Sequence, residues 1–431
     1  MSKYNWAAEK RANLAEHSLV KHQIYAQYLK NYVVERTTRF GMENFRLNVV
    51  DGFCGGGAYT TSSGEKALGS PIVALNALYE AASEINAGRT KPINFDFRLL
   101  CYDKNQTALD RLRSELIEAG YEAEIDRTIH IQRSHFSQVA KRVVDRLHAE
   151  PGRTIFLLDQ YGYGAVTFDT LKYIFSTLSQ PEVILTFGYD WLANFVGTYE
   201  SVCAKFNTLA LPPPPYEEYL KACGGKFGVP FFIQRQLTRE FRNVAQFFTP
   251  FFITSRDDGP LRGSNLKYWL VHLAQHERAN DVMKRTHWGV HNHSAHFGGD
   301  GLQMLGYDAY QKGLAGQAHL FGEIDQARTH YALLEDIPKV LEPEAWVRVD
   351  SLWRNTCNET TSTSEMQRAA LRALVEAKEL EVLGPSGGSK RGLTVAKADL
   401  IRVPVQASFH FMKNPLPAHL HPSSPPFQNG R

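Results

Sequence analysis

Short apolar runs recur along the first two thirds of the chain and alternate with polar, amphipathic stretches of helical length. Continuous apolar runs that end at Gly, Pro or Asp are typical of strands covered on both faces by helices. Such runs predict the strands of one parallel sheet: 45–50, 97–102, 129–132, 154–158 and 183–187. Two later runs, 247–254 and 266–273, are joined by turn-forming residues and predict an antiparallel pair. The pattern therefore predicts an α/β fold with a Rossmann-like sheet.

Residues 7–38 carry a broken apolar stripe, so residues 1–40 are assigned as an N-terminal helical segment. The sheet domain is assigned to residues 41–290. Within it, Ser70 and Pro71 are typical of a helix start, because serine caps the first turn and proline needs no amide donor there. A four-proline run and a glycine pair interrupt the alternation and predict an insertion at about 198–245.

The chain after Tyr331 follows a different order of elements. Helix, strand, helix, helix, strand, turn and strand is the order of a winged helix, and residues 331–405 are assigned to such a domain. Residues 291–330 have weak periodicity and are interpreted as a connector. The proline-rich tail, 406–431, is predicted to be disordered.

Length and composition narrow the class of protein. A chain of 431 residues exceeds what one hydrophobic core usually supports, so more than one folded unit is expected. The 48 basic and 45 acidic side chains leave a formal charge of +3, which neither requires nor excludes a nucleic-acid partner. The five cysteines show no C-x-x-C pair, and no apolar run reaches the length of a membrane span or a signal peptide. We expect a soluble, cytoplasmic protein with free thiols and no membrane partner.

The strand 45–50 ends in Asp51 and a glycine-dense turn. Gly55 and Gly57 allow positive φ and a close approach of the backbone to a ligand, which predicts a nucleotide-like cofactor at the end of the strand. The pattern is neither G-x-G-x-x-G nor a phosphate-binding loop, and it resembles the first motif of S-adenosylmethionine-dependent methyltransferases. The alternative is a tight turn without a ligand.

Asp103 ends the second strand, where a carboxylate can accept hydrogen bonds from both ribose hydroxyls of a nucleoside. The alternative role for Asp103 is to cap the helix that follows. Ser134 and His135 come after the third strand and are assigned to the adenine. The predicted cofactor-binding residues are Asp51, Gly52, Phe53, Gly55, Gly57, Asp103, Ser134 and His135.

Residues 159–162, Asp-Gln-Tyr-Gly, form the predicted catalytic turn. Asp159 would accept a hydrogen bond from an exocyclic amine, and Tyr161 would stack on a flipped base. The turn resembles the Asp-Pro-Pro-Tyr loop of amino-methyltransferases, although both prolines are missing. The turn contains no cysteine nucleophile for carbon methylation, and Cys54 is interpreted as a packing residue.

Substrate contacts are predicted on the helix before the first strand, at the ends of two later strands and in the winged helix. His22 would serve either as a core residue or as a contact, and Lys390 with Arg391 would meet phosphates at the wing. The alternative for the winged helix is a protein-docking module. The tract His287 to His296 has no cysteine or carboxylate nearby, so no metal site is predicted. The predicted substrate-binding residues are Lys21, His22, Gln160, Trp191, Arg372, Lys390 and Arg391.

Several of these motifs occur in the order found in the three-Cys-motif partner (TcmP) proteins of bacteria. The resemblance spans about residues 15–290 and rests on Lys21-His22, 50–57, 69–75, 158–162 and the region of Trp288. That family usually shows Asp-Pro-Tyr-Gly or Asp-Pro-Phe-Gly where this chain has Gln160. The resemblance implies a methyltransferase-like fold and a partner protein with a three-cysteine, radical-enzyme-like motif.

Two functions of different class follow from these observations. The first is an S-adenosylmethionine-dependent methyltransferase that acts on DNA or RNA, with Asp159 and Tyr161 at the acceptor. The second is a non-catalytic protein that binds nucleic acid or recruits a partner on the same scaffold. A third function uses the same sheet edge for another adenosine-containing ligand. Binding of S-adenosylmethionine separates them, because a scaffold has no need of it.

Overall fold

The computed structural model of the chain describes residues 11–14, 16–39, 41–150, 152–189, 192, 197–224, 228–253, 268–290, 294–295, 299–302, 304, 321–342, 344–390 and 392–404. Contacts divide the chain into two units, Met1–Ser294 and Ala295–Arg431, and each is described by itself. Much of the predicted connector at 291–330 and the predicted tail at 406–431 lie outside the described residues.

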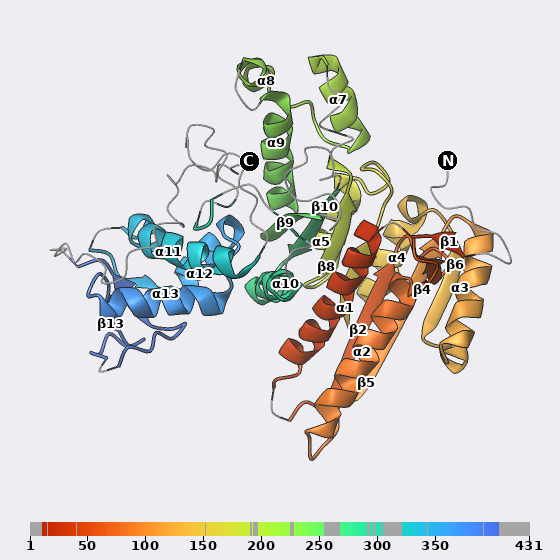
Figure 1. The fold of residues 1–431 in the computed structure, drawn as a ribbon, viewed down its shortest axis with the longest axis horizontal. Helices are drawn as coiled ribbons and strands as arrows, with labels where there is room; N and C mark the ends of the chain where they lie inside the picture. Colours follow the sequence, from red (N-terminus) through yellow and green to blue (C-terminus); the bar gives the residue numbers. More distant parts are fainter. Residues whose placement is uncertain are drawn as a thin grey trace, which may run out of the picture. The chain divides into compact units, whose positions relative to one another are not determined.

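The first unit is built on a mostly parallel sheet (Figure 1). Neighbouring parallel strands follow the order β6-β5-β2-β7-β8, with bounds β6 (Ile129–Arg133), β5 (Asn94–Asp103), β2 (Asn44–Asp51), β7 (Arg153–Leu158) and β8 (Glu182–Phe187). β10 (Tyr268–Ala274) pairs antiparallel with β8 and with β9 (Phe247–Ile253), and β11 (Ser294–Ala295) is next to β9. The predicted α/β fold with a mostly parallel sheet and an antiparallel pair is confirmed.

The apolar runs form strands because helices cover both faces of the sheet. Side chains alternate between faces along β7: Ile155 and Leu157 join the core beneath α1 and α2, whereas the ring of Phe156 lies against Phe136 of α4. Every residue of β8, β9 and β10 is buried. Continuous burial of this kind explains why these strands show no polar alternation in the sequence.

The helices form two layers. One layer shares a core with the sheet and contains α1 (Glu16–Arg36), α2 (Ser70–Ala87), α3 (Gln106–Glu118) and α10 (Glu277–Gly289). The other contains α4 (Phe136–Ala149), α5 (Phe168–Thr177) and α9 (Gly228–Val244), which contact one another in that order. The predicted insertion contributes α7 (Tyr199–Thr208) and α8 (Tyr216–Cys223), which Figure 1 shows in green beside α9. One turn, η1 (Glu122–Glu124), is a 3₁₀ helix.

A small second sheet was not predicted from the sequence. It has the order β1-β3-β4 and consists of β1 (Ala12–Asn13), β3 (Ala58–Thr60) and β4 (Lys66–Leu68). Its core is a separate apolar cluster formed by Ala12, Leu14, Tyr59 and Ala67. Strands of two or three residues are too short to produce a recognisable hydrophobic period, so the pattern gave no sign of them.

The second unit has its own core. Its elements are α11 (Glu323–Val340), β12 (Val347–Arg348), α12 (Val349–Thr356), η3 (Cys357–Glu359), α13 (Ser364–Glu376), β13 (Glu381–Leu383) and β14 (Leu400–Arg402). The strands pair in the order β12-β14-β13, all antiparallel. Gln367 of α13 is buried and donates to the hydroxyl of Ser362 at 3.2 Å.

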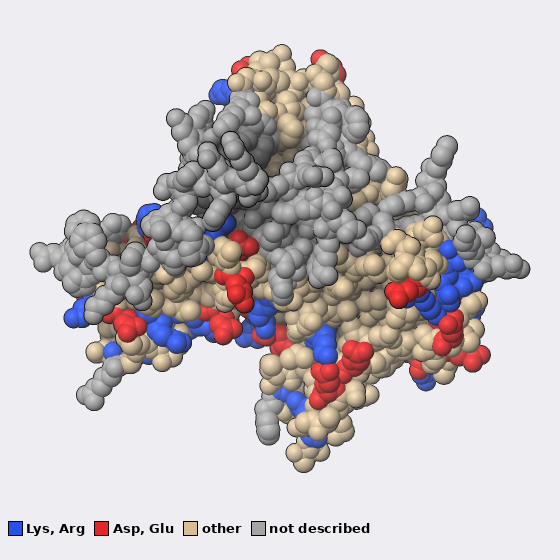
Figure 2. All heavy atoms as spheres, in the orientation of Figure 1, with Lys and Arg blue, Asp and Glu red and all other residues tan. Residues whose placement is uncertain are grey.

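Charged side chains are mixed on the surface. On the face drawn in Figure 2, lysine and arginine lie beside aspartate and glutamate among the residues shown in colour, and no broad basic patch covers it. Among the helices that the structure describes, none combines the length and the apolar character needed to cross a bilayer.

Candidate active site

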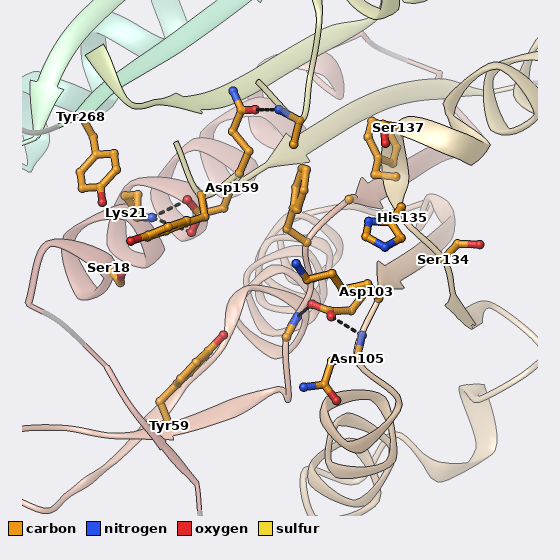
Figure 3. Close-up of a pocket in the computed structure, with 18 of the residues that line it drawn as sticks. Ser18, Lys21, Tyr59, Asp103, Asn105, Ser134, His135, Ser137, Asp159 and Tyr268 are labelled. Carbon is orange, nitrogen blue, oxygen red and sulfur yellow. Dashed lines mark hydrogen bonds and ion pairs between the residues drawn. The ribbon is translucent and has the colours of Figure 1, made fainter. Parts of the chain in front are cut away.

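A pocket of about 410 Å³ opens at the carboxyl ends of the parallel strands. This edge of an open α/β sheet is where ligands bind, because the loops that follow the strands leave a crevice there. Figure 3 shows two groups of side chains on opposite sides of it: Asp103, Asn105, Ser134 and His135 on one side, and Ser18, Lys21, Asp159 and Tyr268 on the other. After the roles that the sequence predicts for them, we call these the cofactor end and the acceptor end.

The cofactor end is organised by the carboxylate of Asp103 at the end of β5. One oxygen accepts from the amide of Gly55 at 3.2 Å, and the other accepts from the amide of Asn105 at 2.8 Å. Gly55 has a φ of 58°, which a side chain would disfavour. A carboxylate has about four acceptor positions, so Asp103 can hold the glycine turn in place and still accept from two hydroxyls of a ligand.

The alternative role of Asp103 as a helix cap is wrong. Asn105 occupies the cap of α3, and its side chain accepts from the amides of Thr107 and Ala108. Asn105 also lines the pocket and was missed, although an asparagine just before a helical stretch is a recognisable cap signal. Asp103 is therefore left to face the pocket.

Asp51 differs from its predicted place as a cofactor contact. It is buried and is not among the residues that line the pocket; its oxygens accept from the hydroxyl of Ser70 at 2.6 Å and from the amide of Phe53 at 3.1 Å. Burial raises the pKa of Asp51 to about 7, against the lowering effect of these two hydrogen bonds. Asp51 thus joins the glycine turn to the start of α2, one layer behind the pocket.

The glycines of the turn divide in the same way. Gly52, Phe53 and Gly55 line the pocket as predicted, whereas Gly57 does not. Gly57 has a φ of 77°, and a Cβ there would lie 2.8 Å from a methyl group of Leu112. This position needs glycine because the turn packs tightly against α3, not because a ligand approaches it.

Ser134 and His135 follow β6 and both line the pocket. The amide of Ser134 donates to the carbonyl of Asp103 at 2.9 Å, which ties the β6 loop to the β5 loop. Phe136 is buried beneath them, with its ring 6.1 Å from that of Phe53. The two predicted adenine contacts thus lie at the same end of the pocket as Asp103.

An ion pair dominates the acceptor end. The ammonium of Lys21 lies 2.5 Å from each carboxylate oxygen of Asp159, joining α1 to the end of β7 (Figure 3). Burial would raise the pKa of Asp159, but the charge of Lys21 and its hydrogen bonds outweigh burial and lower it. Asp159 is therefore already paired, a constraint that the sequence did not reveal.

His22, next to Lys21, also lines this end and is neutral at physiological pH. Burial and the charge of Lys21 lower its pKa to about 4. The ring nitrogen Nδ1 is buried and has no hydrogen-bond partner among the described residues. The two interpretations of His22, core residue or contact, therefore both describe part of its position: it is buried, and it forms part of the pocket wall.

Gln160 has a structural role in the turn that the sequence predicts to be catalytic. Its side-chain oxygen accepts from the amides of Ala165 and Val166, both at 2.9 Å. The turn is further fixed where the amide of Gly188 donates to the carbonyl of Gly162 at 2.8 Å. A Cβ on Gly188 would lie 2.8 Å from that carbonyl oxygen, so the close approach of the two strand ends requires glycine. Although Gln160 lines the pocket, its side-chain oxygen is bonded to the backbone of the loop.

Aromatic side chains complete the acceptor end. Tyr161 lines it and is 54% exposed. The sequence missed Tyr59, from the unpredicted β3, and Tyr268, whose ring centre lies 6.0 Å from the Lys21 ammonium. Tyr268 could have been found: it begins β10, and the start of an antiparallel strand lies at the carboxyl edge of its parallel neighbours. The other lining residues that the sequence missed are Leu14, Ser18, Lys104, Asn105, Phe136, Ser137 and Ala165.

The remaining predicted contacts lie elsewhere. Trp191 and Arg391 are outside the described residues. Arg372 is exposed on α13 of the second unit, but the ammonium of Lys390 pairs with the buried carboxylate of Asp399, so its charge is neutralised within that unit. A contact between Lys390 and phosphates stays a prediction.

The histidine tract is only partly described. His287 is buried against the ring of Phe251, and burial lowers its pKa to about 3; His291, His293 and His296 are outside the described residues. Over the part of the chain that the structure describes, no group of three or more His, Cys, Asp or Glu side chains is arranged to hold a metal.

Several solved structures that resemble this chain are named methylases or methyltransferases, but the similarity is low. No protein-family model and no curated protein matches the chain. Similar solved structures include an rRNA methylase from Streptococcus thermophilus, with 12% identity and a TM-score of 0.27 over 59% of this chain and 93% of that one. A SAM-dependent methyltransferase from Agrobacterium tumefaciens has 14% identity and a TM-score of 0.24 over 44% and 50%. A ribosomal protein L11 methylase from Lactobacillus delbrueckii subsp. bulgaricus has 11% identity and a TM-score of 0.23 over 57% and 77%. At these values the likeness carries no argument about activity.

Proposed function

We propose that this protein is an S-adenosylmethionine-dependent methyltransferase. The observation that carries the proposal is the cofactor end of the pocket, where the positive-φ Gly55, the Asp103 carboxylate and the Ser134–His135 loop meet at one edge of the sheet. The five parallel strands with the antiparallel β10 match the methyltransferase architecture expected from the sequence. A turn that binds no ligand would have no use for this convergence.

The residues present suit an adenosyl ligand. Asp103 has acceptor positions left for two ribose hydroxyls, and the exposed His135 beside the half-buried Ser134 offers a wall for the adenine. The bound cofactor would supply an electrophilic methyl group. The protein's own task is then to hold the acceptor atom in line with that methyl carbon.

We further propose that the acceptor belongs to DNA or RNA and that a partner protein takes part. Tyr59, Tyr161 and Tyr268 at the acceptor end offer faces on which a base can stack. The element order of the second unit suits a winged helix that would hold nucleic acid through Arg372. The motifs shared with three-Cys-motif partner proteins support a second protein with a three-cysteine, radical-enzyme-like motif.

The decisive experiment is calorimetry of the full chain with S-adenosylmethionine and S-adenosylhomocysteine. We expect both to bind, and Asp103→Asn to weaken binding roughly tenfold to a hundredfold because one charged acceptor is lost. Asp110→Asn, an exposed position on α3, is the matched control and should leave binding unchanged. Absence of binding by the wild-type chain contradicts the proposal, and preference for a different adenosine-containing ligand favours the third function described above.

The second candidate, a non-catalytic binding protein, is favoured by one observation. The predicted catalytic carboxylate is already held by Lys21 at 2.5 Å and cannot serve as an unpaired base. Transfer of the cofactor's methyl group to any nucleic acid, with or without the partner, contradicts this candidate. Binding of nucleic acid without binding of S-adenosylmethionine supports it.

A further inference from the structure

The two members of the Lys21–Asp159 ion pair are not equally exposed. The side chain of Lys21 is 5% exposed and that of Asp159 is 25% exposed, although both line the acceptor end. The ammonium is thus the inner member of the pair, and the carboxylate is the member that a ligand meets. Lys21 lies on α1, whereas Asp159 lies in the turn after β7.

This arrangement fixes what Asp159 can do. An ionised carboxylate only accepts hydrogen bonds, and about four acceptor positions are available, of which Lys21 occupies one on each oxygen. The lowered pKa of Asp159 keeps it ionised at neutral pH, so it stays an acceptor and does not take up a proton. A ligand group that donates an N–H to Asp159 binds more tightly. A group that presents a lone pair to it binds more weakly.

The neighbouring His22 carries no charge at physiological pH, because burial and the charge of Lys21 lower its pKa to about 4. Lys21 is therefore the cation that holds Asp159 in its ionised form.

We propose that Lys21 is a positioning residue that keeps Asp159 a permanent hydrogen-bond acceptor, so that the acceptor end selects a planar ring bearing an amino group over the same ring bearing an oxo group. This inference rests on the proposed function and names its substrate class. In the transfer, the lone pair of the amine nitrogen bonds to the methyl carbon, the carbon–sulfur bond breaks with its electron pair left on sulfur, and the surplus proton leaves to water. The hydrogen bond to Asp159 orients the amine for that attack.

The test compares matched nucleosides on the full chain saturated with S-adenosylhomocysteine. Adenosine should bind about tenfold or more tightly than inosine, and cytidine about tenfold or more tightly than uridine, because the oxo analogues place a lone pair against a charged acceptor. Asp159→Asn should abolish both preferences while leaving the affinity for S-adenosylhomocysteine unchanged.

Lys21→Met separates a positioning role from a general structural one. Without the ammonium, burial raises the pKa of Asp159, so the amino preference should be weaker at pH 6 than at pH 9. Lys21→Arg keeps a cation and should retain the preference at both pH values, which also guards against a Met variant that fails to fold. Lys30→Met is the control, because Lys30 lies on α1 like Lys21 and makes an exposed pair with Glu84 of α2.

Each outcome decides the matter. If S-adenosylhomocysteine binds but the nucleosides fail to bind or bind equally, the inference is wrong and the proposed function stands. The inference is also wrong, with the proposed function intact, if Lys21→Met lowers nucleoside binding equally at every pH. If S-adenosylhomocysteine does not bind, the proposed function fails, and this inference fails with it.

Discussion

Single carboxylates at the ends of strands perform three different tasks in this fold. Asp103 faces the pocket, Asp159 is held by Lys21, and Asp51 is buried behind the glycine turn. The sequence places all three in equivalent positions, directly after apolar runs. What distinguishes them is the set of groups brought near by other elements, which decides the pKa and the remaining hydrogen-bonding capacity of each.

The raised pKa of Asp51 predicts a specific pH dependence of stability. Its folded value, about 7, lies above the ordinary 3.8, so between these values the folded chain holds a proton that the unfolded chain has released. The contribution of Asp51 is therefore fully present below about pH 4 and is lost as pH rises to about 7. With about 1.4 kcal/mol for each pKa unit, the loss is on the order of 4 kcal/mol.

Urea unfolding of wild type and Asp51→Asn between pH 4 and pH 8 measures this effect. The variant, which cannot ionise, should become the more stable protein as the pH rises. The buried His22 and His287 have lowered pKa values and change stability in the opposite sense, but they are common to both proteins and cancel in the difference. A difference that stays constant across this range contradicts the prediction.

Gln160 stands where similar turns have a proline, and it fixes the turn through hydrogen bonds of its side chain. Its side-chain oxygen accepts from the amides of Ala165 and Val166, so Gln160→Ala leaves two donors unpaired, one of them buried. We expect a loss of about 1–3 kcal/mol in unfolding free energy and faster hydrogen exchange at those two amides. Gln138→Ala, at an exposed position on α4, is the control; unchanged exchange at Val166 in the Gln160 variant overturns the expectation.

At the scale of elements, a charge cluster holds the small sheet against α3. Glu115 of α3 is 1% exposed and pairs with Arg11 at 2.8 Å, Lys66 at 2.8 Å and Arg111 at 2.9 Å. Burial would raise the pKa of Glu115, but the hydrogen bonds from Arg11 and Lys66 outweigh it and lower the pKa. The cluster fixes β1 and β4, and with them Leu14 and Tyr59 over the pocket.

Arg11→Met should loosen β1 without unfolding the unit. The amide of Leu14, which donates to the carbonyl of Thr60 at 2.8 Å, should exchange about fivefold faster or more, since a partly buried pair of this kind contributes about 1 kcal/mol. Global stability should fall by no more than that amount. Arg113→Met, on the same helix as Glu115, removes an exposed pair with Asp126 and should leave Leu14 unaffected. Equal exchange of Leu14 in both variants would show that the cluster does not anchor β1.

The elements that could be predicted are those with enough residues to show a period. The runs at 154–158 and 183–187 gave β7 and β8 almost to the residue, because burial on both faces leaves a continuous apolar stretch. The three strands of the small sheet were not predicted, because each has only two or three residues. Tyr59 and Leu14 were lost from the predicted site along with them.

Pairing across long sequence separations accounts for most of the rest. Lys21 and Asp159 were both singled out from the sequence, yet no local pattern indicated that their charges meet across 138 positions. Lys390 and Asp399 are only nine positions apart, yet no pattern in the sequence indicated that they form an ion pair either. Sequence reasoning located the edge of the sheet and the residue types there, but it could not assign their partners.

At the scale of the whole molecule, the proposed nucleic-acid partner places a requirement on the second unit. A winged helix holds nucleic acid through cations whose contacts release counterions, so affinity should fall steeply with salt concentration. On α13, Arg372 is exposed and has no ion pair in the described part of the chain, unlike Lys390. It is therefore the cation through which the proposal is most directly tested.

Replacing Arg372 with Ala should weaken binding of duplex oligonucleotides about equally for every sequence and reduce the slope of log affinity against log salt by about one. The reason is that one phosphate contact is lost while no base contact is changed. Lys339→Ala on α11, whose charge is shared with Glu335 and Asp336, is the control and should leave the slope unchanged. A slope that is the same in wild type and in the Arg372 variant removes α13 from the interface and favours the protein-docking alternative for this unit.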